Sequence, residues 1–367
     1  MARILSDEKR LQVLGALVEG NSERAVARLT GTGTHTVRRF VLQLGEGAMR
    51  LHNRLVRNLN CSTLELDEQW SYVKKKQARV IPGKDGPEVG EAWVWIAVHP
   101  TSQLIVSFYV GKRTGEDAKA VVADLRSRLS VMPSLITSDG LAAYIEPIWV
   151  EFGPAVNYAQ VIKNYRTGAT RGPDHRYEPP RDPFLTKKAI LGAPDLDRAT
   201  TGHVENKNLL TRHFNGRMRR LCLAFSKKLE NHKAAMALGF VYRNFCWVPR
   251  NLRVTPAMAA GITDHLWDLA EFMEAVLGAE PCEPPSAEPL LLPAPPTTAR
   301  PLPNGRGFLR VVPSGGGPAP VAAPVQPVPP PPEAPAVVVG PATDETGQLD
   351  LLSWVAPPRE GVQLSLF

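Results

Sequence analysis

Short apolar runs of two different periods fill residues 60–246, and their order restricts the fold more than any other feature of the chain. Helical spacing covers residues 116–129 and about 202–247. Five shorter runs, rich in β-branched and aromatic residues, predict strands at residues 63–67, 94–98, 104–110, 135–138 and 155–159. Three successive strands joined by short turns favour an antiparallel meander, and the later alternation of strand and helix favours parallel additions to the same sheet. We therefore expect an α/β fold in which helices flank one mixed sheet.

Residues 1–50 predict a separate all-α domain. Two breaks, at residues 20–21 and 30–33, separate stretches of helical spacing at residues 7–18, 22–29 and 34–44. This arrangement is typical of a helix-turn-helix, in which the first turns of the third helix enter the major groove of DNA. The outward face of that helix carries the candidate DNA contacts His35, Arg38 and Arg39. A plain three-helix packing unit is the alternative.

Basic side chains outnumber acidic ones in the part of the chain that we expect to fold. The whole chain has 43 Lys and Arg and 36 Asp and Glu, but residues 281–367 hold only four of the basic and seven of the acidic residues. The remaining surplus of positive charge favours a polyanionic partner such as nucleic acid and predicts salt-sensitive binding. A basic surface that only keeps the protein in solution is the alternative.

Two features favour a cytoplasmic protein with no membrane partner. The sequence contains no uncharged apolar run of about 18 residues, and residues 1–7 do not begin a secretory leader. The four cysteines form no C-x-x-C pair, which fits neither a zinc cluster nor a disulfide framework; they are Cys61, Cys222, Cys246 and Cys282.

Composition changes sharply after residue 280. Residues 251–279 still show amphipathic spacing and predict a helical appendage. Residues 281–367, by contrast, hold 22 of the 35 prolines. Such a segment cannot bury enough apolar surface to offset the entropy lost on ordering. We therefore predict a disordered, Pro-rich tail at residues 280–367.

Three acidic residues fall at positions suited to a metal site. Asp67 closes the first predicted strand, Asp139 follows the fourth, and Glu205 lies on the helix that begins near residue 202. If these two strands are neighbours in the sheet, both aspartates leave it at the same edge. Phosphoryl transfer with two divalent metal ions needs several carboxylate ligands that converge on one point. Glu68, the next residue along the strand, would point to the opposite face.

Basic side chains follow Glu205 along the chain. Glu205, Asn208 and Arg212 share one helix face, so Asn208 and Arg212 are candidate contacts to the DNA that is cleaved. Further candidates on the same predicted helix are Arg217, Arg219 and Arg220. We interpret this basic stretch as a track for DNA phosphates; an ordinary solvated helix face is the alternative.

Several motifs, taken in order, resemble the bacterial DDE transposases of the insertion-sequence-one family. The resemblance covers about residues 60–262, and its motifs are LDEQWSYV at residues 66–73, GKRT at 111–114, Ser138-Asp139-Gly140 with Tyr144, and HVENKNL at 203–209, running on to RRL at 219–221 and FSK at 225–227. It implies a ribonuclease H-like catalytic domain at residues 60–250. Within it, Asp67, Asp139 and Glu205 would be the catalytic ligands of two Mg²⁺ or Mn²⁺ ions.

The same resemblance implies an activity. The protein would be a transposase of a bacterial insertion sequence, which binds terminal inverted repeats, cleaves DNA and joins the freed 3′-hydroxyl to a target strand. Such an enzyme would act as a homo-oligomer on double-stranded DNA in the nucleoid. Two alternatives remain open: a nuclease or resolvase of the same fold without strand transfer, and a non-catalytic helix-turn-helix regulator.

The chain departs from the family pattern between the second and third candidate ligands. Asp139 and Glu205 are 66 residues apart, and an insert at residues 164–197 is rich in Pro, Gly and Arg. Asp195 and Asp197 are therefore alternatives to Glu205.

The end of the sequence carries one further motif. Residues 363–367, QLSLF, resemble the pentapeptide that binds the bacterial DNA sliding clamp, and a weaker copy lies at residues 348–352. In this interpretation Gln363 forms hydrogen bonds, while an apolar pocket of the clamp takes Leu364, Leu366 and Phe367. The tail would then act as a flexible tether.

Overall fold

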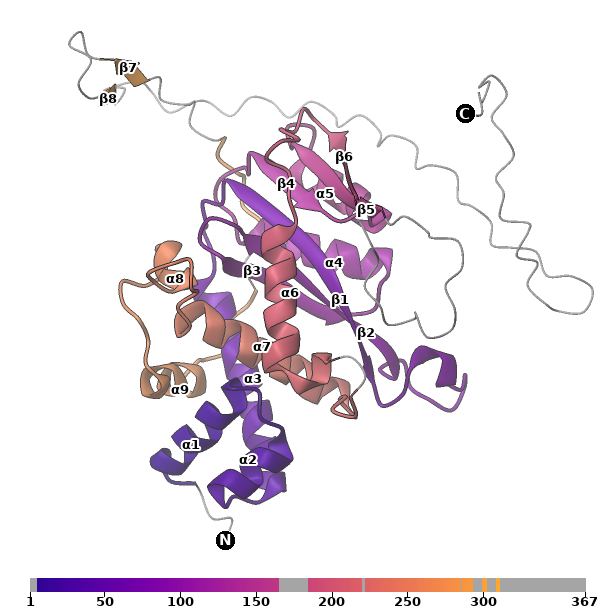
Figure 1. Cartoon of the computed structure of the whole chain (residues 1–367), viewed down its shortest axis with the longest axis vertical. Helices are drawn as coiled ribbons and strands as arrows, with labels where there is room; N and C mark the ends of the chain where they lie inside the picture. Colours follow the sequence, from indigo (N-terminus) through magenta and orange to yellow (C-terminus); the bar gives the residue numbers. More distant parts are fainter. Residues whose placement is uncertain are drawn as a thin grey trace, which may run out of the picture. The chain divides into compact units, whose positions relative to one another are not determined.

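A mixed six-stranded sheet lies at the centre of the fold, in the strand order β3-β2-β1-β4-β5-β6 (Figure 1). Its strands are β1 (Thr63–Val73), β2 (Gly90–His99), β3 (Leu104–Gly111), β4 (Leu135–Ser138), β5 (Tyr158–Asn164) and β6 (Phe184–Leu191). The first three form an antiparallel meander, β4 and β5 join β1 in parallel, and β6 pairs antiparallel with β5 at the edge. The expected α/β fold with a mixed sheet and flanking helices is therefore confirmed.

The structure is a computed structural model that describes residues 5–164, 184–219, 222–284, 286–292, 299–301 and 308–310. Most of the predicted disordered tail, the final pentapeptide and Arg220 lie outside these residues. Within the tail, β7 (Ala299–Pro301) and β8 (Phe308–Arg310) form a separate antiparallel pair. None of the helices in the described residues is both long enough and apolar enough to span a membrane.

Helices cover both faces of the sheet. On one side, α6 (Gly202–Phe214) packs against β1 and β2, and α7 (Leu229–Phe245) packs against β3. On the other side, α4 (Gly115–Ser127) packs against β2 and β3, next to α5 (Ile145–Phe152). Strands covered on both faces need apolar residues at nearly every position, and β3 is buried along almost its whole length.

The N-terminal residues form three helices: α1 (Asp7–Val18), α2 (Glu23–Thr30) and α3 (Thr34–Leu55). Ser6 and Ser22 cap the first two, because each hydroxyl accepts a hydrogen bond from a backbone N–H three residues later. The predicted helices at residues 7–18 and 22–29 are thus nearly correct. The third was predicted to end at residue 44, but it continues to Leu55.

Two glycines lie in α3 beyond residue 44, where the helix packs against other helices. A Cβ atom at Gly45 would lie 2.4 Å from Cα of Ala234 on α7, and one at Gly47 would lie 2.1 Å from the carbonyl oxygen of Val276 on α9 (Leu269–Leu277). These residues therefore permit close packing of α3 against α7 and α9 and do not end the helix. Buried side chains of α1, α3 and α9 belong to the same hydrophobic cluster as those of the central sheet. The domain boundaries at residues 50, 60, 250 and 279 stay predictions.

The later elements differ from the sequence prediction in three places. The strand predicted at residues 155–159 lies further along the chain, as β5 (Tyr158–Asn164), because residues 155–157 belong to the turn and loop before it. The single helix expected at residues 202–247 is two helices, because the chain leaves α6 at Asn215, forms a short 3-10 turn (η4, Gly216–Met218) and resumes helix at Leu229. Between them, Ser226 accepts a hydrogen bond of 2.7 Å from the backbone N–H of Lys74 beyond the end of β1. The insert at residues 164–197 also supplies a strand that was not predicted, β6. The C-terminal appendage contains α8 (Pro256–Ala259) and α9.

Candidate active site

The register of two parallel strands brings Asp67 and Asp139 together. β1 and β4 pair up to Leu66 opposite Ser138, where β4 ends and β1 continues. Asp67 is the next residue of β1, and Asp139 is the first residue after β4. Ligand oxygens of Asp67, Glu68 and Asp139 lie within 4.8 Å of one another, and this is the one group of three or more such side chains in the described part of the chain.

Hydrogen bonds orient the two aspartates. Oδ1 of Asp67 accepts from the backbone N–H of Glu68 (2.9 Å), and Oδ2 accepts from the side-chain amide of Asn208 on α6 (2.6 Å). Oδ1 of Asp139 accepts from the backbone N–H of Leu141 (3.1 Å), which turns the loop after β4 back over the carboxylate. Each ionised carboxylate has about four acceptor positions. Both aspartates therefore keep oxygens that can bind a cation.

Glu68 takes part in this group although the sequence pattern assigned it to the other face. Its carboxylate accepts a hydrogen bond from Nε of Arg113 (2.9 Å) and one from the hydroxyl of Tyr144 (3.2 Å), which lie on the side opposite α6. Because β4 ends before this point, no neighbouring strand separates Glu68 from Asp139. The alternation of side chains along β1 was predicted correctly, but the short length of β4 brings both faces to one edge.

The carboxylates raise one another's proton affinity. Burial raises the pKa of Asp67 to about 7, and the nearby charges of Asp139 and Glu68 act in the same direction. Burial and Asp139 likewise raise the pKa of Glu68 to about 7, although Arg113 opposes the shift. Burial also raises the pKa of Asp139. A group of crowded, partly desolvated carboxylates is stabilised by a hard divalent cation, which prefers oxygen ligands. The donor set thus fits Mg²⁺ or Mn²⁺.

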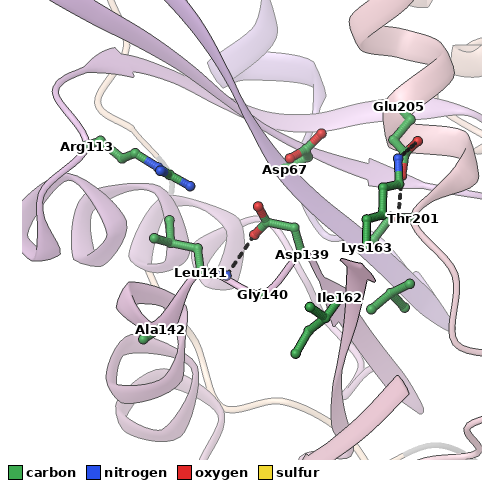
Figure 2. A pocket seen from close by; sticks show the side chains of 11 residues that line it. Asp67, Arg113, Asp139, Gly140, Leu141, Ala142, Ile162, Lys163, Thr201 and Glu205 are labelled. Atoms are coloured by element: carbon green, nitrogen blue, oxygen red, sulfur yellow. Dashed lines mark hydrogen bonds and ion pairs between the residues drawn. The ribbon is translucent and has the colours of Figure 1, made fainter. Parts of the chain in front are cut away.

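Glu205 reaches the same pocket from α6. The pocket has a volume of about 500 Å³ and is lined by Asp67, Arg113, Asp139, Gly140, Leu141, Ala142, Val161, Ile162, Lys163, Thr201 and Glu205 (Figure 2). The Glu205 carboxylate is bound by the ammonium group of Lys163 on β5 and by the hydroxyl of Thr201 at 2.6 Å. It is therefore not one of the three carboxylates that lie within 4.8 Å of one another. The alternatives Asp195 and Asp197 are not among the described residues that line this pocket.

Buried polar residues of β1 fix the position of α6. Glu65, only 2% exposed, accepts a hydrogen bond of 2.9 Å from the backbone N–H of Val204 in the first turn of the helix. The side-chain amide of Gln69 donates to the carbonyl oxygen of Asn208 (2.8 Å). Sequence reasoning missed Glu65 and Lys163. The available signal for Glu65 was its place two residues before Asp67, on the same face of a strand with apolar neighbours.

The predicted basic track is not a continuous helix face. Asn208 is 6% exposed and contacts Asp67, so its side chain lies within the site. Arg217 lies in η4, where it forms an ion pair of 2.6 Å with Glu23 of α2. Arg219 lies in the extended segment beyond η4 and donates to the carbonyl oxygen of His213 on α6 (2.6 Å). Arg212 is half-buried in the last turn of α6.

The three candidate DNA contacts of α3 are all exposed in the first two turns of the helix. Arg38 forms an ion pair of 3.1 Å with Glu23, the same acid that binds Arg217. Glu23 thus connects α2 to α3 and to the segment after α6. His35 and Arg39 share this exposed surface with Arg38.

Comparison with known proteins gives distant structural likenesses. No protein-family model and no curated protein matches the chain. The chain is similar to a pre-cleavage Mos1 transpososome (8% identity, 43% of this chain and 60% of that chain, TM-score 0.17) and to the piggyBac transposase synaptic complex with hairpin DNA (9%, 75% and 71%, 0.37). It is also similar to the Mos1 mariner paired end complex with Mn (11%, 41% and 58%, 0.15). The chain thus covers about three fifths of the Mos1 chains, and with TM-scores below 0.5 these likenesses do not define its chemistry.

Proposed function

We propose that the chain is a metal-dependent polynucleotidyl transferase acting on DNA, a transposase of the DDE type. One observation carries this proposal. The carboxylates of Asp67, Glu68 and Asp139 converge within 4.8 Å where β4 ends beside the continuing strand β1, next to a pocket that Glu205 also lines. Acids this close together in a structure are unfavourable unless a cation or proton compensates their charge.

Asp67 and Asp139 are the residues that would bind the divalent ions. Glu68 and Glu205 would supply further carboxylate ligands. Two bound Mg²⁺ or Mn²⁺ ions would supply activation of a water or a 3′-hydroxyl and stabilisation of the leaving oxygen. Lys163 forms an ion pair with Glu205. The ammonium group of Lys163 therefore holds this carboxylate at the rim of the pocket.

The chain's own residues would bind and orient the DNA. Arg113 and Lys163 both line the pocket, and beside their ion pairs with Glu68 and Glu205 they keep further N–H donors that would contact DNA phosphates. Asn208 fixes the carboxylate of Asp67 through its amide. Glu65 holds α6 at its first turn, and so keeps Asn208 and Glu205 in place.

A strand-transfer assay tests the proposal. Pre-cleaved duplex ends that carry a free 3′-hydroxyl should be joined to a target duplex when Mg²⁺ or Mn²⁺ is added, and Asp139→Asn should abolish joining. Metal-dependent nicking without joining would favour the nuclease or resolvase alternative. Duplex binding with neither reaction would favour the non-catalytic regulator. If inverted repeats flank the coding region, duplexes of that sequence would be the natural substrate for this assay.

Two further parts of the proposal concern partners. Homo-oligomers on DNA would bring two ends together, which sedimentation with and without duplex ends measures. Binding of the sliding clamp depends on residues 363–367, outside the described part of the chain. Removal of these five residues should abolish clamp retention in a pull-down with the full chain, and unchanged retention would contradict it.

A further inference from the structure

The hairpin of β1 and β2 continues past the end of β4, and the two faces of its first strand differ in polarity. β1 pairs with β4 only up to Leu66, but it pairs with β2 as far as Val73 (Figure 1). On the face that contacts α6 and α7, this outer part of β1 carries Gln69 and Ser71, which are 1% and 3% exposed. Aromatic side chains occupy the opposite face. The buried face is therefore polar and the more exposed face is apolar, the reverse of an ordinary amphipathic strand.

Four aromatic rings form a continuous row on the second face, which we call the aromatic row. Trp70 and Trp93 are directly opposite each other across the hairpin. The ring centroids of Trp70 and Tyr72 are 5.5 Å apart, and Tyr72 stacks on Phe225 at 4.9 Å. All four side chains are half-buried, and Leu223, two residues before Phe225, is 92% exposed. The rings thus keep part of their surface in contact with solvent.

The adjoining part of the same face belongs to the core. Trp95, two residues beyond Trp93 on β2, is completely buried, and Tyr144 packs edge-on against its ring at 5.4 Å. Burial of a large aromatic side chain is strongly favourable in a folded protein. A row of four rings that stay half-buried next to a buried one therefore indicates a surface that binds a partner.

The aromatic row begins at the carboxylate site. Glu68 and Trp70 lie on the same face of β1, two residues apart, which is about 7 Å along a strand. Arg113 connects the two regions, because its guanidinium carbon lies 4.7 Å from the centre of the Trp93 ring while its Nε donates to Glu68 (2.9 Å). A DNA strand that passes the carboxylates can therefore continue onto the rings.

The charge beside the aromatic row suits a polyanion. Residues 74–89, which connect β1 to β2, contain five basic and two acidic residues, and two of the lysines form ion pairs with Asp85. Lys76 and Lys227 follow aromatic residues of the row in the sequence and are exposed. Glu91 is the acid nearest the row, and its carboxylate accepts a hydrogen bond of 3.3 Å from an indole N–H of the row.

We propose that the aromatic row binds unpaired DNA, a single strand that leaves the carboxylate site. Its bases stack on Trp70, Tyr72 and Phe225, and its phosphates contact Arg113 and the exposed lysines of the hairpin. Aromatic rings stack on any base, so this binding does not depend on sequence. An apolar protein segment would leave the cations without partners. This inference rests on the proposed function and adds to it a site for single-stranded substrate next to the cleavage site.

The test compares two labelled duplexes of the same sequence, one blunt and one with an unpaired overhang of about eight nucleotides on either strand. Fluorescence anisotropy in EDTA, which prevents cleavage, gives both dissociation constants for the full chain. The wild type should prefer the overhang, and this preference should fall about tenfold in Trp70→Leu/Tyr72→Leu, which keeps apolar side chains but removes the rings. Trp149→Leu, at a half-buried position on α5, is the matched control and should keep the preference. An equal preference in the wild type and the double variant would overturn the proposal.

Single variants of Tyr72 separate stacking from folding and from charge. Tyr72→Phe keeps the ring and should retain the preference for the overhang within about twofold, whereas Tyr72→Leu should lose about threefold or more. Because stacking releases no counterions, the difference between these two variants should persist at high salt. Tyr72→Leu that matches Tyr72→Phe, or a difference that disappears at high salt, would contradict stacking on this ring.

A protein partner on the same surface gives a different result. If two copies of the chain associate through the aromatic row, sedimentation without DNA will detect a dimer that Leu223→Asp dissociates. Such a dimer, together with an unchanged preference for the overhang in Trp70→Leu/Tyr72→Leu, would overturn the proposal and assign the row to contacts between copies.

Failure of this inference is distinguishable from failure of the proposed function. If the wild-type chain nicks DNA only with Mg²⁺ or Mn²⁺ but does not prefer the overhang, the single-strand site is wrong and the transposase proposal stands. If the wild type prefers the overhang through Trp70 and Tyr72 but shows no metal-dependent reaction, the single-strand site stands and the transposase proposal fails.

Discussion

Glu65 and His203 are joined by two contacts across 138 residues of sequence: the Glu65 carboxylate accepts from the backbone N–H of His203 (2.9 Å) and lies 2.8 Å from its ring Nδ1. With the bond to Val204, this carboxylate caps the N-terminus of α6, where a negative charge is favourable. A residue of β1 thus sets where α6 begins. The same strand supplies Asp67, so strand and helix meet in a fixed geometry at the candidate site.

We expect Glu65→Ala to weaken both stability and activity. The substitution leaves two helix N–H groups without an acceptor in a buried position, which should lower the free energy of unfolding by about 1–3 kcal/mol. Metal-dependent nicking should fall further than stability explains, because Glu205 and Asn208 lose their fixed position. Thermal unfolding and a nicking assay below the melting temperature measure the two effects. Glu274→Ala, at an exposed position, is the control; nicking equal to that of this control would contradict the role of Glu65.

Gly45→Val should destabilise the protein by about 1–3 kcal/mol or more, because the new side chain overlaps the backbone of α7 at Ala234. Gly239→Ala on α7 is the matched control. An added Cβ there meets nothing within 4 Å, so the change should be neutral or stabilise the helix by about 0.5–1 kcal/mol. Chemical denaturation of both variants checks this pair. A Gly45→Val variant as stable as the wild type would mean that α3 and α7 are not packed this closely.

The raised carboxyl pKa values predict how pH changes the stability of the metal-free protein. Asp67 and Glu68 titrate near pH 7 in the folded state but near pH 4 when unfolded. Between these values the folded state binds more protons, so the free energy of unfolding falls as pH rises from about 4 to 7. The substitution Asp67→Asn should reduce this slope. Denaturation in EDTA at several pH values measures it, and a stability that rises over the whole window would contradict the prediction.

Divalent ions should restore the stability that the metal-free protein loses as the pH rises. Binding to ionised carboxylates stabilises the folded state, by about 2.7 kcal/mol when the ion concentration is 100 times its dissociation constant. The melting temperature should therefore rise on adding Mn²⁺ at pH 8, and the rise should shrink at pH 5.5, where protons compete for the same oxygens. Asp139→Asn should remove most of the rise in melting temperature that Mn²⁺ causes. The same shift in Asp139→Asn as in the wild type would place the ion elsewhere.

Glu205 and Glu68 should differ in their effects on metal stoichiometry. Because Glu205 lies outside the close group of carboxylates, we expect Glu205→Gln to bind one Mn²⁺ ion where the wild type binds two. Loss of the second ion in Glu205→Gln should also slow nicking about 100-fold, which corresponds to about 3 kcal/mol of transition-state stabilisation. Calorimetric titration with Mn²⁺ and a nicking assay measure the two effects. Two bound ions in Glu205→Gln would instead favour Glu68 as the third ligand.

Local periodicity was enough to predict most of the strands and helices, since a strand and an amphipathic helix each place their apolar residues at a characteristic spacing. It predicted β3, β4 and the first two helices closely, but it covered only about half of β1 and of β2 and placed the fifth strand before its true position. The break between α6 and α7 was missed although Asn215-Gly216 is a dipeptide that favours turns, because the apolar residues on either side of it were read as one continuous helical pattern. Contacts between residues distant in sequence determine the features that periodicity did not predict. Ser226 pairs with the backbone at the end of β1, and α7 packs over Gly45 of α3.

The sequence by itself placed Asp139 directly after a strand and indicated that Glu205 follows on a helix, but it ended the first strand at Asp67, whereas β1 continues to Val73. Only the tertiary structure decided which carboxylates come close together, because this depends on strand register and on where β4 ends. It brought Glu68 into the group, placed Lys163 against Glu205 and used Glu65 to hold α6. Spacing along a chain determines which face a side chain occupies, but distances between elements depend on how the whole sheet and its helices pack.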